Sequence, residues 1–234
     1  MKRFWDQAVA TPTAEGHAVL LDGRPLRLPG AGPLNLPSAP LAEAVAAEWQ
    51  AAGGQKGAEF RMEDVPLTRV VATALERIAP DTEPSILALA EYGGTDLLCY
   101  RAAEPKLAAR QRQAWQPLLE WAAEAYGAPL GVTTGIMPIS QPAASRAALA
   151  AALARRNALE LAALGVAIPA LGSLVLGLAL AEGRLDADEA TRLAFLDEDF
   201  QQELWGTDAE AAERRRNVAA EVALAARLLA LARR

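Results

Sequence analysis

The residues that most often carry out chemistry in proteins are scarce in this chain. His17 is its only histidine and Cys99 its only cysteine, so a Ser-His-Asp or Cys-His arrangement would have to use them. His17 begins a predicted hairpin strand, and Cys99 alternates with apolar neighbours, which is typical of a buried thiol. A zinc site would need carboxylates for most of its ligands. We therefore expect no catalytic residue, no metal and no cofactor.

A dense polar run near the end of the chain, LDEDFQQELWG at 196–206, is the best candidate for a functional segment. Asp197, Glu198 and Asp199 are consecutive, so on a helix they point about 100° apart and do not converge on one ion. A small hydrolase that uses two carboxylates remains an alternative, because acids are plentiful, but nothing in the sequence selects a pair. The composition is typical of a surface that binds another protein.

Projection of this run on a helix separates two faces. An apolar stripe, which we expect to enter the core, contains Leu193, Leu196, Phe200 and Leu204. The other side carries Glu198, Gln201, Gln202 and Trp205. A charged run is usually a solvated face, and Trp205 could simply pack at the helix end. A large aromatic off the core stripe also suits contact with a partner.

The sequence pattern predicts that the first third of the chain is rich in β-strands. Two apolar runs flank Asp22-Gly23, a strong hairpin signal because glycine accepts a positive φ. Ser38 is a suitable cap for a helix that extends to about Gln50. Helical patterns follow near 67–79 and 83–92, and residues 95–101 form the last predicted strand.

Beyond Pro105 the pattern is all helical. Helices are predicted at 143–154, 157–167 and 170–181, and a helix that starts at Asp186 is expected to carry the segment 196–206. The uncharged stretch 164–181 is interrupted by proline and glycines, so it predicts buried helices and no membrane insertion. The fold class is α+β: a small β-rich N-terminal domain with one or more helices, residues 1–103, and a helical C-terminal domain, residues 104–234.

Charge and compartment narrow the possible partners. The net charge of −6 argues against a nucleic-acid surface, which would need a basic stripe. The N-terminal residues MKRFWD lack the apolar run of a secretory signal. We expect a cytoplasmic bacterial protein with a protein partner and no small-molecule substrate.

Short segments spread over residues 3–206 have a specific order and spacing. They include Leu21-Asp22-Gly23-Arg24-Pro25, Glu48-Trp49, Pro66-Leu67-Thr68, Thr95-Asp96-Leu97-Leu98-Cys99-Tyr100-Arg101, Gln113-Ala114-Trp115, Gly172-Ser173-Leu174, Phe200-Gln201 and Trp205-Gly206. In these segments the chain resembles the F1-ATPase assembly chaperones that handle the α subunit, whose mitochondrial members would act in the matrix. Where that family often has consecutive glutamates, this chain has Asp197-Glu198-Asp199.

The resemblance implies a non-catalytic chaperone without nucleotide or metal. Members of this family hold the newly made F1 α subunit in an unaggregated form until the β subunit displaces them. The acidic cluster matches a family segment that contains a functionally important glutamate, and Glu198 is the glutamate here. The expected partner-binding residues are Asp197, Glu198, Asp199, Gln201, Gln202 and Trp205. A non-catalytic protein with another partner remains the alternative.

Overall fold

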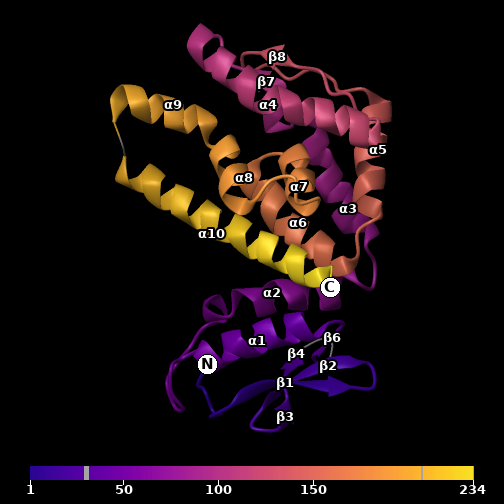
Figure 1. Cartoon of the computed structure of the whole chain (residues 1–234), viewed down its shortest axis with the longest axis vertical. Coiled ribbons are helices and arrows are strands. Elements are labelled where there is room, and N and C mark those ends of the chain that lie inside the picture. Colours follow the sequence, from indigo (N-terminus) through magenta and orange to yellow (C-terminus); the bar gives the residue numbers. More distant parts are fainter. Residues whose placement is uncertain (29–31, 207, 234) are drawn as a thin grey trace. The chain divides into compact units, whose positions relative to one another are not determined.

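The computed structural model describes residues 1–28, 32–206 and 208–233. The chain forms two compact units (Figure 1). The first contains Met1–Asp81, Asn157–Ala162 and Arg227–Arg234, and the second contains Thr82–Arg156 and Ala163–Ala226. Residues 82–103 thus belong to the second unit. The predicted domain boundary after residue 103 concerns which parts of the chain fold separately, and it stays a prediction. The predicted α+β class, with strands concentrated near the N-terminus and helices after them, is confirmed.

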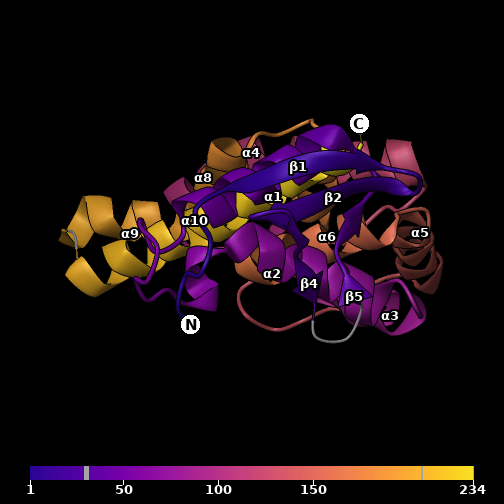
Figure 2. The ribbon, with the colours of Figure 1, turned by 90° about the horizontal axis from the view of Figure 1, so that it is seen from below.

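The first unit is built on an antiparallel sheet covered by a helix. Strand β2 pairs with β1 along its full length, and on its other edge it pairs with β3 and β6. Helix α1 packs on this sheet, and Figure 2 shows β1 and β2 crossing it. The elements are β1 (Ala8–Thr13), β2 (Gly16–Leu21), β3 (Arg24–Pro25), β4 (Arg27–Leu28), β5 (Gly32–Pro33), β6 (Asn35–Leu36), α1 (Ala39–Ala51), η1 (Met62–Asp64), α2 (Pro66–Thr73) and η2 (Ala74–Ile78).

The predicted Asp-Gly hairpin turn is confirmed. Asp22 and Gly23 both have positive φ, 48° and 78°, between paired Leu21 and Arg24. The Asp22 carboxylate accepts hydrogen bonds from the backbone N–H groups of Asp6 and Gln7 at 2.9–3.1 Å. These hydrogen bonds lower the pKa of Asp22. One aspartate therefore forms the turn and holds the segment that leads into β1.

Two of the short sequence segments meet in the core of this unit. The carboxylate of Glu48 accepts hydrogen bonds from the backbone N–H groups of Leu67 and Thr68 at 2.6 and 2.8 Å, so it caps the N-terminus of α2. Trp49 donates its indole N–H to the hydroxyl of Thr68 at 2.9 Å. The Trp49 ring also packs against Trp5, at 5.1 Å between ring centroids. The predicted Ser38 cap of α1 is confirmed by a hydrogen bond from the N–H of Leu41.

The second unit is predominantly helical. Its elements are α3 (Glu83–Ala90), η3 (Glu91–Gly94), η4 (Leu97–Cys99), β7 (Tyr100–Arg101), α4 (Pro105–Tyr126), β8 (Thr133–Thr134), α5 (Ala143–Ala154), α6 (Ala158–Leu171), α7 (Leu174–Ala181), α8 (Ala187–Ala194), α9 (Leu196–Trp205) and α10 (Ala209–Ala232). The first residues of α6 and the last of α10 belong to the first unit. The expectation of helices alone beyond Pro105 is wrong for β8, which pairs in parallel with β7.

The strand predicted at 95–101 is wrong for most of its length. A 3-10 helix occupies Leu97–Cys99, and only Tyr100–Arg101 is extended. The reason is Asp96, which is fully buried and accepts hydrogen bonds from the N–H groups of Leu98 and Val175, each at 3.0 Å. The hydroxyl of Ser173 donates to the same carboxylate at 2.7 Å. Asp96 therefore caps both the 3-10 helix and α7.

The apolar stretch 164–181 forms buried helices, as predicted, but with a later break. Pro169 lies inside α6, and Gly172, with φ at 64°, separates α6 from α7. The hydroxyl of Ser173 accepts a hydrogen bond from the N–H of Leu176 and caps α7. A Cβ atom on Gly177 would lie 2.4 Å from Ile168, so the absence of a side chain there lets α6 and α7 approach closely. In the part of the chain that the structure describes, no helix is long and apolar enough to cross a membrane.

Candidate functional site

The polar segment 196–206 forms a helix of its own, α9. The helix capped by Asp186, α8, ends at Ala194, and Phe195 leaves helical geometry at φ −98° and ψ 16°. The expectation of one continuous helix through the segment is therefore wrong. The indole N–H of Trp115 on α4 donates to the carbonyl of Leu193 at 3.0 Å, which satisfies an end carbonyl of α8.

The buried stripe of α9 is shorter than predicted. Phe200 is buried, and Leu196 is half-buried. Leu204, which was expected on the core stripe, is 60% exposed. Leu204 follows Leu196 and Phe200 at a spacing of four and shares their face of α9, but the buried part of that face ends before the C-terminal end of the helix. Buried apolar side chains therefore hold α9 to the rest of the unit at few positions.

Polar contacts to the neighbouring helices hold α9 in place. The side-chain amide of Gln111 on α4 donates to Asp197 at 2.7 Å. The guanidinium of Arg110, also on α4, pairs with Glu203 at 2.7 Å and lies over the ring of Phe200 at 5.1 Å. α9 is thus bound to α4 near both of its ends.

The remaining two acids of α9 bind α10. Glu198 pairs with Arg214 at 3.2 Å, and Asp199 pairs with Arg215 through both guanidinium nitrogens. The guanidinium groups of Arg214 and Arg215 also lie over the ring of Phe195, at 5.6 and 5.3 Å. The acids that were predicted to contact a partner are therefore all occupied by contacts within the chain, and they position the helix.

The outward side of α9 carries the other predicted residues. Gln201 is exposed and Gln202 is half-buried. Trp205, at the C-terminal end of the helix, is 79% exposed beside exposed Leu204. Large apolar side chains at adjacent exposed positions are uncommon unless they serve recognition. The structure thus divides the predicted site into acids that fasten α9 and an outward tip, which we define as Gln201, Leu204 and Trp205.

The electrostatics of α9 follow its contacts. Partial burial raises the pKa of Asp197, opposed by the hydrogen bond from Gln111. The hydrogen bond and charge of Arg110 lower the pKa of Glu203. Two carboxylates that act as general acid and general base would need to lie in one shared site, with the pKa of one of them raised. Asp197 and Glu203 instead bind different side chains of α4, so the arrangement offers no such pair.

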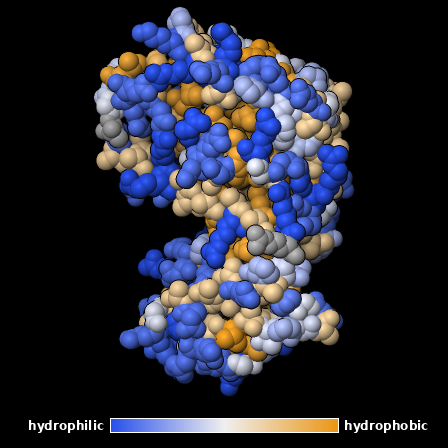
Figure 3. All heavy atoms as spheres, viewed as in Figure 1, coloured by the Kyte–Doolittle hydropathy of each residue, from blue (hydrophilic) through white to orange (hydrophobic). Residues whose placement is uncertain are grey.

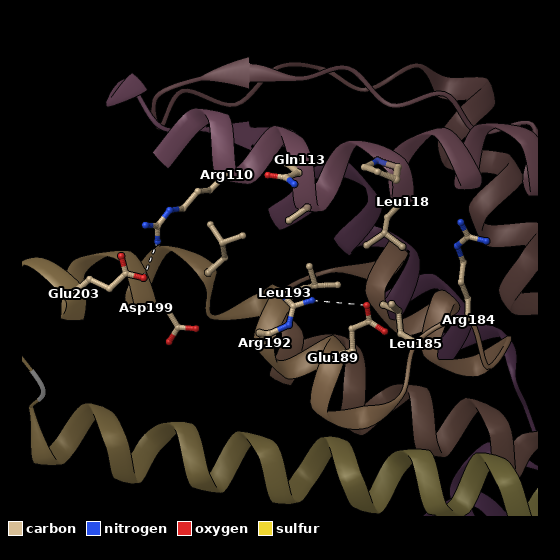
Figure 4. Close-up of a pocket in the computed structure, with 13 residues that line it drawn as sticks. Arg110, Gln113, Leu118, Arg184, Leu185, Glu189, Arg192, Leu193, Asp199 and Glu203 are labelled. Atoms are coloured by element: carbon tan, nitrogen blue, oxygen red, sulfur yellow. Dashed lines mark hydrogen bonds and ion pairs between the residues drawn. The ribbon is translucent and has the colours of Figure 1, made fainter. Parts of the chain in front are cut away.

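A groove of about 760 Å³ lies between α4, α8 and α9. Figure 4 shows Arg110, Arg184 and Arg192 around it, and the buried side chains of Leu118 and Leu193 also line it. The acids at its edge are paired: Glu203 with Arg110, and Glu189 with Arg192 at 3.8 Å. Figure 3 shows apolar surface between charged side chains where α4, α7 and α8 meet. An apolar floor with a charged rim suits a segment of another protein.

The residues that could have served as nucleophiles or ligands are placed elsewhere. Cys99 is buried, and desolvation together with the charge of Asp96 raises its pKa to about 12. The thiol is therefore protonated and inert near neutral pH. His17 lies in β2, in the first unit. Among the described residues, no group of three or more histidine, cysteine and acidic side chains is arranged to hold a metal ion.

Comparison with known proteins gives the family. The model of the ATP12 chaperone protein family matches residues 2–123, just over half of the chain. The chain belongs to the ATP12 chaperone family. The resemblance to F1-ATPase assembly chaperones is confirmed.

Solved structures extend the likeness over the whole chain. Atp12 from Paracoccus denitrificans is 41% identical with a TM-score of 0.91, and the match covers 99% of this chain and 98% of that one. The Atu1473 protein of Agrobacterium tumefaciens is 40% identical with a TM-score of 0.89, covering 100% and 86%. Protein atp12, mitochondrial, of Schizosaccharomyces pombe is 25% identical over an alignment of 225 residues, and the match covers 91% of this chain and 76% of that protein.

Sequence reasoning missed the side chains of α4 and α10 that hold α9. Arg110 and Gln111 precede the matching segment at 113–115, and Arg214 and Arg215 begin a run of three arginines. That run was a usable signal, because a basic run on the helix after an acidic one can pair with it across a short turn. The groove had no comparable signal, because its lining brings α4 together with α8 and α9, which lie far from α4 in the sequence.

Proposed function

We propose that this ATP12-family chaperone binds the unassembled α subunit of F1-ATPase, prevents its aggregation and releases it to the β subunit. It does so without catalysis, in the bacterial cytoplasm. The observation that carries the proposal is the outward tip of α9, in which Trp205 is 79% exposed on a helix fastened by its own acids. The family membership supplies the class of partner.

The physical requirements of such a chaperone agree with this surface. An unassembled ring subunit exposes an interface that is apolar at its centre and charged at its rim. Trp205 and Leu204 can cover apolar area, while the charged pairs of α9 and the arginines of the groove face the rim. Exposed charged contacts accelerate encounter and add modest affinity. A larger interface with the β subunit can then displace the chaperone.

The acids keep a role in this proposal. Asp197, Glu198, Asp199, Gln201, Gln202 and Trp205 remain the proposed partner site, with the acids positioning α9 as well as contributing charge. Glu198 is 39% exposed in its pair with Arg214, so it can exchange that contact for one with the partner. Exposed pairs of this kind contribute little to folding, about 0–1 kcal/mol.

Co-expression with the cognate α subunit tests the proposal. We expect the chain to keep the α subunit in the supernatant and to co-purify with it. Glu198→Lys and Trp205→Ala should each weaken the complex while the thermal unfolding midpoint changes little. Glu43→Lys, the same charge reversal at an exposed acid of α1, is the matched control and should bind normally. An α subunit that aggregates equally with and without the chain would refute the proposal.

A further inference from the structure

The connection between α4 and α5 presents apolar side chains from a fixed base. We call residues 131–141 the apolar finger. It contains β8, which pairs in parallel with β7, and the N–H of Gly135 donates to the carbonyl of Arg101 at 2.8 Å. Neither α9 nor the groove includes it.

The two ends of the finger are clamped together. The side-chain amide of Gln141, itself buried, accepts from the N–H of Gly131 at 2.7 Å and donates to the carbonyl of Gly131 at 2.9 Å. Next to this pair, the hydroxyl of Ser145 donates to the carbonyl of Pro129 at 2.6 Å. Ile139 packs over the clamp, because a Cβ atom on Gly131 would lie 2.9 Å from its Cδ1 atom. The base of the finger is therefore built to hold one shape.

The tip of the finger exposes apolar surface. Ile136 is 92% exposed and Met137 is 73% exposed, and Val132 and Ile139 are partly exposed as well. A clustered set of this kind marks an interaction site more often than a solvated surface. Methionine adapts its shape to different apolar partners. Because the clamp already orders the finger in the free protein, the finger loses less conformational entropy when it binds a partner.

The charge of this region indicates the partner. No charged residue occurs from Ala125 to Ser145, although 22% of the whole chain is charged. Burying a charge opposite such a segment without a partner would be costly, so the complementary surface must be apolar and uncharged. Membrane-binding loops usually add lysine or arginine for anionic lipids, and the finger has none. The absence of charge favours a protein recess.

We propose that the apolar finger inserts into an uncharged apolar recess at the centre of the subunit interface of the partner that α9 binds. The inference rests on the proposed function, because it takes the unassembled F1 α subunit as that partner. The two surfaces are complementary in chemistry: the finger fits the apolar centre of such an interface, and α9 fits its charged rim. The finger supplies apolar contact, while the charged pairs of α9 supply orientation.

The test uses the full chain and the cognate α subunit. Ile136→Ser combined with Met137→Ser changes side chains that are exposed, so the unfolding midpoint should stay close to that of the wild type. We expect the affinity for the α subunit to fall at least about tenfold, as for truncation of an interface anchor. Leu87→Ser removes a comparably exposed leucine from α3 and should leave the affinity unchanged. A photo-crosslinking residue at position 137 should capture the α subunit.

The outcomes separate the two proposals. If the wild type and the double variant bind the α subunit equally well, the finger proposal is overturned and the proposed function stands. If the wild type does not bind the α subunit, both fall. Loss of vesicle binding in the double variant, with anionic phospholipid vesicles as the probe, would make the finger a membrane element. Conversion of a wild-type dimer to a monomer would make it a contact between copies. Either result overturns the proposal.

Discussion

Arg215 holds Asp199 through both of its terminal guanidinium nitrogens, and this pair joins α10 to α9. Each side chain is about one-third exposed, 31% and 33%, so solvent screens the pair only in part. Because Phe200 is the buried side chain of α9, such polar contacts decide how firmly the helix is held. The presentation of Trp205 therefore depends on charges that lie several residues before it.

A double-mutant cycle on this pair should show coupling. Asp199→Ala and Arg215→Ala are expected to couple by about 1 kcal/mol, as for a partly screened bidentate pair. Amide hydrogen exchange in α9 should accelerate in Asp199→Ala, while the core of the second unit stays protected. Additive effects together with unchanged exchange in α9 would show that the pair does not hold the helix.

The same substitution, tryptophan to arginine, should affect stability very differently at Trp49 and at Trp205. Trp49→Arg would bury a charge beside Trp5 and leave Thr68 without its donor, so we expect a loss of about 3–5 kcal/mol in the free energy of unfolding. Trp205→Arg, at an exposed site, should change it by less than about 0.5 kcal/mol. Urea unfolding measures both. Equal effects of the two substitutions would contradict the burial of Trp49.

The raised pKa of Asp197 predicts a pH-dependent stability. Because this pKa is higher in the folded protein than in the unfolded chain, ionisation of Asp197 removes stability as the pH rises through the folded pKa. Asp197→Asn keeps an acceptor for Gln111 and cannot ionise. We expect the variant to be the more stable one at pH 7, with an advantage that shrinks as the pH falls toward about 3.9, the unfolded pKa.

Glu203→Gln is the matched control with the opposite sign. Arg110 lowers the pKa of Glu203, so ionised Glu203 contributes stability above its unfolded pKa. The variant should be less stable than the wild type at pH 7, and the difference should vanish at low pH as Glu203 becomes protonated. Thermal unfolding measured between pH 3 and pH 8 (a range of about five units that includes the ordinary carboxylate pKa values) distinguishes the two. The same pH slope in both variants would contradict the contacts assigned to them.

The thiol of Cys99 should be unreactive in the native state. It is buried with its pKa raised to about 12, so neither access nor ionisation favours attack. We expect a thiol reagent at pH 7.5 (about one unit below the ordinary pKa of cysteine) to label the chain only after denaturation. Rapid labelling of the folded protein, at the rate of an exposed cysteine, would contradict this placement.

Features that depend on neighbouring residues were predictable from the sequence. The turn at Asp22-Gly23, the Ser38 cap and the Asp186 cap all act within a few residues, where local conformational preferences dominate. The helix at 143–154 was also predicted with its observed bounds, because an alanine-rich segment after a proline has few alternatives.

Features that depend on distant residues were not predictable. The pattern at Leu97-Leu98-Cys99-Tyr100 suggested a strand, yet these residues begin with a 3-10 helix capped by Asp96. The carboxylate of Asp96 is held there by a hydrogen bond from the N–H of Val175, 79 residues later. The acidic segment likewise looked like a free surface, in part because Arg110 and Gln111, which bind Glu203 and Asp197, lie more than 80 residues earlier. Its exposed tip was only partly predicted: the projection places Trp205 off the core stripe and leaves open whether it packs at the helix end, and it places Leu204 in the core.

The double capping by Asp96 has a consequence for how the second unit folds. Helix α7 has eight residues, too few to be stable alone in water. Its first turn is completed by a carboxylate that also completes the 3-10 helix at Leu97–Cys99. The two short helices therefore form together, once a loop of nearly eighty residues has closed. The formation of α7 should therefore depend on closing this long loop and not on local helix propensity. We expect α7 to form late on the folding pathway.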